Sequence, residues 1–234
     1  AKAELASEEA ETSDLIADPV RMYLREISSV SLLKAADERR LADPIVERII
    51  EDLDSNRIDE FIVVVRSDDR EIGEHFRNES RLSLQVRLVD QPRPLGMADA
   101  LENAAPLITG DFVLSACDNL VDRSDIGRMI DRWSTGSDLN GLLAVMPLEA
   151  EDVTRSSLVE LDGAGVTRIV EKPSERDARP GMASLPLYIF SPAILGYLPK
   201  VRPSIRGERE LQDAVQMLIE RHGRVRAISI THRM

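Results

Sequence analysis

The stretch that decides the fold reads Gln91-Pro-Arg-Pro-Leu-Gly-Met-Ala-Asp-Ala-Leu101 and continues through Phe112-Val-Leu114 to Ser115-Ala-Cys-Asp-Asn119. Two prolines and a glycine shape a loop at its start, because proline cannot continue a helix. The apolar spacing of Leu95, Ala98 and Leu101 then predicts a helix. The short apolar run behind Gly110 is typical of a strand that is buried on both faces. A loop, a helix and a strand therefore follow one another closely.

Asp118 comes directly after this predicted strand. Ligands of open α/β sheets gather outside the carboxyl ends of the strands, so its carboxylate is a candidate ligand for a metal ion or a sugar hydroxyl. A second interpretation, which the spacing leaves equally open, is that Asp118 only caps the next turn.

The composition narrows the class of protein. The chain has 234 residues, 43% of them hydrophobic, and a formal net charge of -12. This charge argues against broad, nonspecific binding of duplex nucleic acid. The single cysteine, Cys117, excludes an intramolecular disulfide and fits a reducing compartment. No apolar run approaches the roughly 18 residues of a membrane span. We therefore expect a cytoplasmic location and no membrane partner.

Hydrophobic periodicity and turn signals predict an alternation of helices and strands. The expected helices are one from Asp18-Pro19, a turn or two at Ala35–Leu41, one from Asp43-Pro44, and helices at 70–78, 124–134, Pro192–Leu198 and Glu208–Arg221. The expected strands are Phe61–Val65, Leu84–Val89, Phe112–Leu114, Leu142–Met146, a hairpin of Ser157–Leu161 and Val166–Val170, Leu185–Phe190 and Val225–Ile230. This alternation predicts an α/β fold with a doubly wound, mostly parallel, Rossmann-like sheet and an N-terminal helical segment.

Three segments are expected along the chain. Residues 1–15 are acidic and nearly devoid of large apolar groups, which predicts a disordered tail. Residues 16–42 form the helical segment, and residues 43–234 form the α/β domain.

The helical segment has a likeness of its own. Asp18-Pro-Val-Arg-Met-Tyr-Leu-Arg-Glu-Ile27, continued by Leu32-Leu33 and Arg40-Leu41, resembles conserved region 1.2 of primary bacterial RNA polymerase sigma factors. The resemblance implies a contact with promoter DNA or RNA polymerase. The other sigma regions are missing, and two arginines on a short helix are weak grounds for DNA binding beside a charge of -12. The alternative is an amphipathic helix that docks on its own or a neighbouring subunit.

Residues 44–230 resemble the sugar-1-phosphate nucleotidyltransferases, above all glucose-1-phosphate thymidylyltransferase and its uridylyl relatives. Four motifs carry the likeness: Gln91-Pro-Arg-Pro-Leu-Gly96; Cys117-Asp118-Asn119; Val170-Glu-Lys-Pro173; and Pro203-Ser-Ile-Arg-Gly-Glu208 leading to Leu211-Gln-Asp213. The reaction of this family is the in-line attack of a sugar phosphate on the α-phosphate of a nucleoside triphosphate, with release of pyrophosphate. Its substrates, and a nucleotide sugar as product, are the expected ligands.

The resemblance also implies a role for individual residues. It implies that Gln91 and Gly96 bind the base, and that Glu171 and Asn119 bind the sugar. It also implies that Lys172 and Asp118 act in catalysis, and that Asp118 and Asp213 bind one Mg²⁺. Each has a purely structural alternative. Lys172 and Glu171 could form a surface ion pair of little energetic consequence, Asp213 could be an ordinary residue of a first helical turn, and Gln91 could bridge a loop.

The sequence departs from the family pattern at its start. The loop G-G-x-G-T-R-L, which holds the triphosphate through backbone N–H groups, is missing, as are its preceding strand and the Lys-Pro that follows. Losing one such donor costs on the order of 10²–10³ in rate. The missing strand is central in the family's sheet, so Ser29–Leu33 or a strand of another subunit would have to replace it. Ser157, Pro186 and Cys117 also replace family glycines.

We therefore predict a nucleotidyltransferase-fold protein that binds a nucleotide or nucleotide sugar with weak or no turnover. One alternative is an active thymidylyl- or uridylyltransferase whose phosphate loop comes from a partner chain, as in a homo-oligomer. Another is a transcription-linked regulator that uses the sigma-like segment. A third is a gene rearrangement without selected function.

Overall fold

The computed structural model describes residues 35–67, 85–117, 120–136, 138–148, 150–174, 179 and 181–230. The chain divides into two units, residues 1–41 and 42–234. Several expectations lie outside the described residues. They are the acidic tail, the helix from Asp18-Pro19, the strand Ser29–Leu33, the helix at 70–78, and the placement of Asp118 and Asn119.

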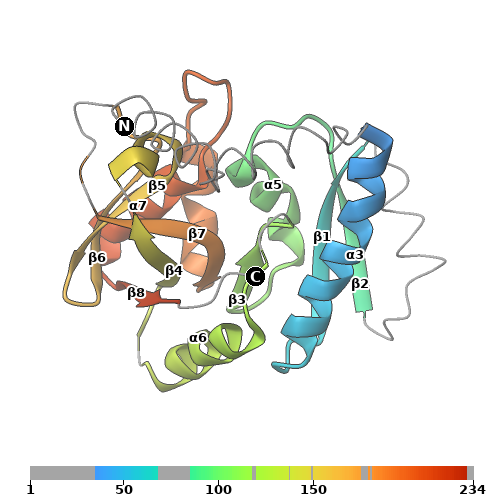
Figure 1. Cartoon of the computed structure of the whole chain (residues 1–234), viewed down its shortest axis with the longest axis horizontal. Coiled ribbons are helices and arrows are strands. Elements are labelled where there is room, and N and C mark those ends of the chain that lie inside the picture. The colour runs from blue at the N-terminus through green and yellow to red at the C-terminus, as the bar shows by residue number, and fades with distance from the viewer. Residues whose placement is uncertain are drawn as a thin grey trace, which may run out of the picture. The chain divides into compact units, whose positions relative to one another are not determined.

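The described helices and strands follow one another as expected in most of the second unit (Figure 1). The α-helices are α3 (Ala35–Asp54), α5 (Met97–Ala104), α6 (Arg123–Thr135) and α7 (Leu211–His222). The strands are β1 (Glu60–Arg66), β2 (Gln85–Gln91), β3 (Phe112–Ser115), β4 (Gly141–Leu148), β5 (Ser157–Asp162), β6 (Gly165–Glu171), β7 (Gly181–Phe190) and β8 (Val225–Ser229). Short 3₁₀ turns are η1 (Ala105–Leu107), η2 (Ala150–Arg155), η3 (Pro192–Gly196) and η4 (Leu198–Lys200).

Helix α3 differs from its prediction. One continuous helix runs through Asp43-Pro44, where the sequence predicted a new start. A proline inside a helix removes one backbone hydrogen bond, yet the helix continues because its second half is anchored. Val46, Ile50 and Leu53 are spaced to share one face, and all three are buried.

The segment Pro192–Leu198 also differs, because it forms the 3₁₀ turns η3 and η4 instead of an α-helix. Pro192 and Pro199 each lack the N–H that an α-helical ladder needs. The predicted glycine stop of α7 is confirmed: Gly223 adopts the left-handed conformation with φ of 62°.

The strands form two sheets. β1 and β2 pair in parallel as a two-stranded sheet. The other strands form a six-stranded sheet in the order β3-β7-β4-β8-β6-β5, and a further pairing of β7 with β5 partly closes it. Within this sheet β4 and β8 are parallel, whereas β7 runs antiparallel to β3, β4 and β5.

The α/β class is therefore confirmed, but the expectation of a mostly parallel sheet is wrong. The hairpin of β5 and β6 is antiparallel, as its short turn requires. Strand β7 then enters the sheet between β3 and β4. Periodicity predicts that such a strand exists and cannot tell which neighbours it pairs with.

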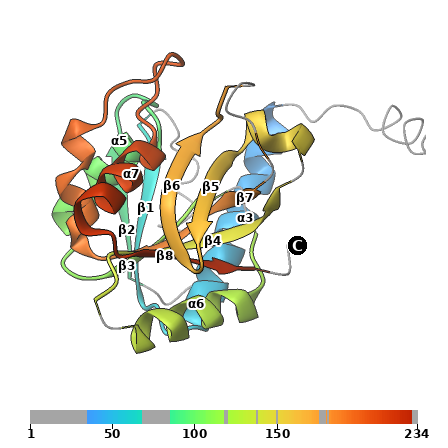
Figure 2. The same ribbon diagram turned by 90° about the vertical axis from the view of Figure 1, so that its left-hand side faces the viewer.

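Both faces of the six-stranded sheet are covered. On β4, Leu142 and Ala144 belong to one buried apolar cluster, and Leu143 and Val145 belong to another. Successive side chains of a strand point to opposite faces, so the two clusters lie on opposite sides of the sheet. Helix α6 and α3 supply the first cluster, and α7 supplies the second, where it lies beside β6 (Figure 2).

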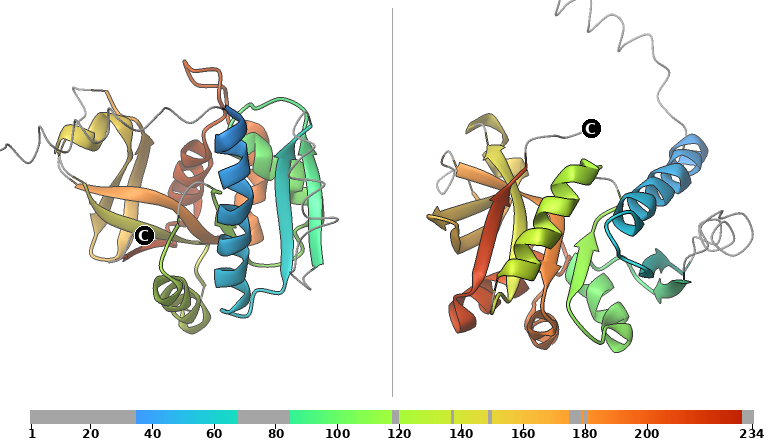
Figure 3. Two further views of the ribbon diagram at one scale, coloured as in Figure 1. Left: turned by 45° about the vertical axis from the view of Figure 1, so that its right-hand side comes forward. Right: turned by 90° about the horizontal axis from the view of Figure 1, so that it is seen from below.

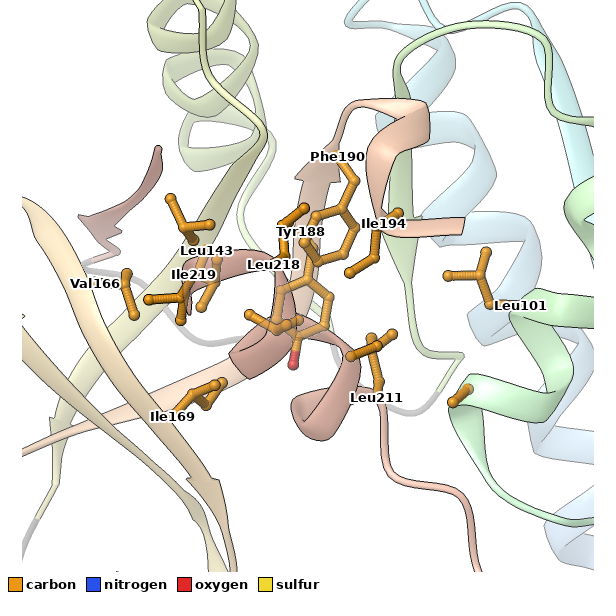
Figure 4. Packing of buried hydrophobic residues seen from close by; sticks show 14 of the residues in the cluster. Leu101, Leu143, Val166, Ile169, Tyr188, Phe190, Ile194, Leu211, Leu218 and Ile219 are labelled. Carbon is orange, nitrogen blue, oxygen red and sulfur yellow. The ribbon is translucent and has the colours of Figure 1, made fainter. Parts of the chain in front are cut away.

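The second cluster is centred on two aromatic residues. Tyr188 and Phe190 occupy alternate positions of β7, and their rings stack with centroids 5.5 Å apart (Figure 4). Leu211 and Leu218 of α7 pack into the same cluster. This packing fixes α7, and therefore the residues of its first turn, against the sheet.

The two sheets meet through shared apolar contacts without a common ladder. Phe61 of β1 lies in the same buried cluster as the α6-facing residues of β4 and β7. Among the described strands, β1 pairs only with β2 and β3 only with β7 (Figure 3). Within the described part of the chain, no helix is long and apolar enough to cross a membrane.

Candidate functional site

Gln91 is the last residue of β2 and lies at the carboxyl end of this parallel strand. Its side-chain amide donates to the backbone carbonyl oxygen of Gly96 at 3.2 Å and to the Asp99 carboxylate at 2.9 Å. The intervening loop contains Pro92 and Pro94, which stiffen it. The two residues predicted to contact a base are thus held together by a direct hydrogen bond.

Gly96 precedes α5 with φ of 98°, a conformation that favours glycine. A Cβ atom at this position would lie 2.7 Å from the backbone oxygen and 2.9 Å from the backbone nitrogen of Arg209. The backbone of Arg209 also donates to Leu95 O at 2.6 Å and accepts from Ala98 N at 3.1 Å. Backbone hydrogen bonds therefore join the loop to the Arg209 segment, much as they join neighbouring strands of a sheet.

The Arg209 side chain strengthens this junction. Its guanidinium forms ion pairs with Asp99, at 3.2 Å, and with Glu102, both on α5. It also donates to the backbone carbonyl oxygens of Val201, at 3.2 Å, and Leu198. Only 14% of the side chain is exposed. Arg209 consequently connects the Gln91 loop to the segment that enters α7.

Asp213 lies in the first turn of α7. Partial burial of its carboxyl group raises its pKa, and the negative charges of Glu210 and Glu171 raise the pKa further. None of the described residues donates a hydrogen bond to this carboxylate or forms an ion pair with it. Asp213 is thus a carboxylate with two negatively charged neighbours, and a bound cation would relieve their repulsion.

Glu171 is the last residue of β6, and Lys172 follows it directly. The Glu171 side chain is 16% exposed, and its Oε1 lies 4.0 Å from the Lys172 amine and 3.7 Å from the Arg206 guanidinium. Arg206 also pairs with Glu210 at 2.7 Å. This pairing raises the pKa of Arg206, so the guanidinium stays charged. Two cations and two carboxylates therefore alternate beside Asp213.

A chain of hydrogen-bonded, buried polar groups ends on the Glu171 carboxylate. Ser157 donates to Glu171 Oε2, and Gln212 donates to Ser157 Oγ at 3.0 Å. The Tyr188 hydroxyl lies 3.2 Å from Ser184 Oγ and also interacts with Gln212. Burial raises the pKa of Tyr188 to about 12, so its hydroxyl stays protonated.

The structure therefore places five of the sequence-predicted residues in two groups, and the other two lie outside the described residues. Gln91 and Gly96 share one loop, Glu171 lies close enough to Asp213 to raise its pKa, and Lys172 flanks Glu171. Sequence reasoning missed Arg206 as part of the site. Its place in the Pro203–Glu208 motif, between two acidic motifs, was the available signal. The described residues contain no cluster of three or more His, Cys, Asp or Glu side chains able to hold a metal.

The family model described as "Nucleotidyl transferase" matches residues 31–231. The low-salt glycan biosynthesis nucleotidyltransferase Agl11 of Haloferax volcanii is 29% identical over 180 residues, which are 76% of this chain and 49% of that protein. A UTP–glucose-1-phosphate uridylyltransferase of Streptococcus pneumoniae is 26% identical over 208 residues, 75% of this chain and 69% of that protein. The chain thus spans about half the length of the first of these relatives.

Solved structures share the fold. A UDP-glucose pyrophosphorylase in complex with UDP-glucose superposes with a TM-score of 0.71 at 18% identity, covering 81% of this chain and 80% of the other. A UTP-bound UGPase from Acinetobacter baumannii superposes with a TM-score of 0.68 at 21% identity, covering 81% and 75%. At such identities the likeness establishes the fold alone.

Proposed function

Because this chain belongs to the nucleotidyl transferase family, we propose that it binds a uridine or thymidine nucleotide in the loop of Gln91 and Gly96, with weak or no nucleotidyl transfer. The main support for this proposal is the contact between this loop and the Arg209 segment. It holds the loop against the segment that leads to Asp213, through backbone bonds and a mostly buried guanidinium. A loop anchored in this way is preorganised for a ligand, which lowers the entropy cost of binding.

The loop offers the donor and acceptor that a pyrimidine edge requires. The amide nitrogen of Gln91 is engaged by Gly96 and Asp99, which directs its amide oxygen to act as the acceptor for the ring N–H. The backbone N–H of Gly96 precedes helix α5 and supplies the donor. Without a Cβ atom, Gly96 also lets the base approach the backbone.

Lys172 and Arg206 would meet the phosphates. Both are cationic side chains at the edge of the Glu171 cluster, 46% and 32% exposed. The two side chains would bind phosphate differently, because Arg206 can bind phosphate oxygens in a bidentate manner, whereas Lys172 acts as a point charge. Glu171 would face the sugar of a nucleotide sugar.

Family members typically depend on Mg²⁺, and Asp213 suits this ion. Its oxygens are hard ligands, and a cation would relieve the repulsion from Glu210 and Glu171 that raises its pKa. We propose Asp213 and Asp118 as the pair that holds the ion. When bound, the ion would supply neutralisation of phosphate charge.

The proposal of weak turnover rests on the phosphate-binding side of the site. These 234 residues contain no G-G-x-G-T-R-L loop. Each missing backbone donor costs on the order of 10²–10³ in rate, whereas base recognition depends on residues that are present. We therefore expect the loss to fall on transfer more than on binding.

Isothermal titration of UTP, dTTP and ATP, each with Mg²⁺, tests the binding proposal. We expect UTP or dTTP to bind and ATP to bind at least about tenfold more weakly, because an adenine presents a different hydrogen-bonding edge. The variant Gln91→Ala should lose about tenfold or more in affinity. Gln216→Ala is the matched control, because its amide oxygen accepts from the backbone N–H of Ile169 in β6 and its amide nitrogen donates to Glu220 near the C-terminal end of α7.

A pyrophosphate-release assay with UTP or dTTP, glucose 1-phosphate and Mg²⁺ tests the turnover proposal. We expect little or no release above background. Rapid release that Asp118→Asn abolishes would instead establish the active thymidylyl- or uridylyltransferase.

A further inference from the structure

The carboxylate of Glu171 already has partners on both of its oxygens. Oε2 accepts a hydrogen bond from the Ser157 hydroxyl, and Oε1 faces Arg206 at 3.7 Å and Lys172 at 4.0 Å. A hydrogen bond from a hydroxyl to a carboxylate is charge-assisted and stronger than one between neutral groups. Ser157 therefore places on Glu171 the same kind of group, an O–H donor, that a sugar would bring.

The direction of this hydrogen bond is set by a second contact. Gln212 donates its amide N–H to Ser157 Oγ at 3.0 Å, which uses the serine oxygen as an acceptor. The single hydroxyl proton of Ser157 is then directed to Glu171. Ser157 and Gln212 are each only 8% exposed, so water competes little for either group. Consecutive hydrogen bonds of this kind polarise and strengthen one another.

We propose that Ser157 occupies the sugar-hydroxyl position on Glu171, so that the sugar of a nucleotide sugar adds little affinity beyond that of the nucleoside diphosphate. This inference rests on the proposed nucleotide-binding function. A sugar hydroxyl can bind Oε2 only by displacing or sharing with the serine proton, and it gains little because one O–H donor replaces another. The base and phosphates meet other residues and are unaffected.

The substitution Ser157→Ala separates the hydroxyl from the rest of the side chain. It removes the donor, keeps the Cβ atom and leaves Oε2 and Gln212 available to a sugar. Ser157→Thr keeps the hydroxyl. Ser229→Ala is the matched control, because Ser229 is exposed at the end of β8 and its backbone carbonyl, which the substitution keeps, accepts from Arg128.

Isothermal titration with UDP and UDP-glucose measures the effect. We expect the wild-type protein and the Ser157→Thr and Ser229→Ala variants to bind the two ligands within about threefold of each other. Ser157→Ala should bind UDP-glucose at least about tenfold more tightly than the wild type, the value of a hydrogen bond to a charged group, with UDP affinity unchanged.

Two results would overturn the inference. One is that the wild-type protein binds UDP-glucose tenfold or more tightly than UDP. This measurement does not depend on the folding of any variant. The other is an unchanged ratio of the two affinities in a Ser157→Ala protein whose thermal unfolding matches the wild type. If neither UDP nor UTP binds any of these proteins, the proposed nucleotide-binding function is itself wrong.

Discussion

The backbones of Gly96 and Arg209 approach so closely that a Cβ atom on Gly96 would lie 2.7 Å from the Arg209 carbonyl oxygen. Gly96 also has φ of 98°, which side-chain-bearing residues rarely adopt. We predict that Gly96→Ala lowers the free energy of unfolding by about 2–4 kcal/mol, because backbone strain and a steric overlap add. Urea denaturation measures this. Gly110→Ala is the control, because open space surrounds its Cβ position, and it should change stability little.

Arg209 is expected to be sensitive to both shortening and neutralisation. In Arg209→Met, two α5 carboxylates and two backbone carbonyls lose a donor. The cost should be about 2–4 kcal/mol in unfolding free energy. Lysine should rescue only part of it, since an ammonium cannot reproduce the planar fork. Arg202→Met, at an exposed position, should be close to neutral in the same measurement.

Asp52 and its two arginine partners, at the contact between α3 and α6, are expected to differ in the stability cost of their removal. Its side chain is 2% exposed, whereas its partners Arg48 and Arg123 are 48% and 54% exposed. Removing both arginines, as in Arg48→Ala with Arg123→Ala, leaves a buried unpaired carboxylate and should cost about 3–5 kcal/mol. Asp52→Asn leaves two arginines that water can solvate and should cost less. Chemical denaturation of all variants decides the order, and an equal cost would contradict this account.

Asp213 predicts a dependence of stability on pH. Its folded-state pKa is raised, so the ionised form is disfavoured in the folded protein. The resulting destabilisation is complete above the folded-state pKa and vanishes below the ordinary value of about 3.8. Asp213→Asn should therefore be more stable than the wild type at pH 7 and melt at a higher temperature. The gain in unfolding free energy should be less than about 1 kcal/mol, because the residue is exposed and its carboxyl group is only partly desolvated. The difference should shrink as the pH falls toward 4. A melting difference that grows on acidification would contradict the raised pKa.

Local sequence patterns predicted much of the fold and part of the site. The apolar alternation and turn residues located the hairpin of β5 and β6, the buried strand β4, and the glycine that ends α7. These features depend on residues a few positions apart, which periodicity and turn chemistry capture. The motifs also marked Gln91, Gly96, Glu171, Lys172 and Asp213, whose functional roles stay predictions.

The pairing of distant segments could not be predicted in this way. Arg209 is 110 residues from Asp99, and Gln212 is 55 residues from Ser157. The insertion of β7 between β3 and β4 likewise sets strands side by side that are far apart in the chain. The start of helix α3 could not be predicted locally either. The packing of its buried face keeps the helix continuous through Asp43-Pro44 and overrides the local effect of proline.

The sequence by itself determined the α/β class, the family likeness and the loop of Gln91 and Gly96, because each is written in neighbouring residues. Only the tertiary structure decided that the Arg209 segment fastens this loop, and that Ser157 donates its proton to Glu171. Both contacts form because packing of α7 on the sheet brings remote polar groups into water-poor surroundings. There each donor must find an acceptor, and the partner it finds depends on the fold as a whole.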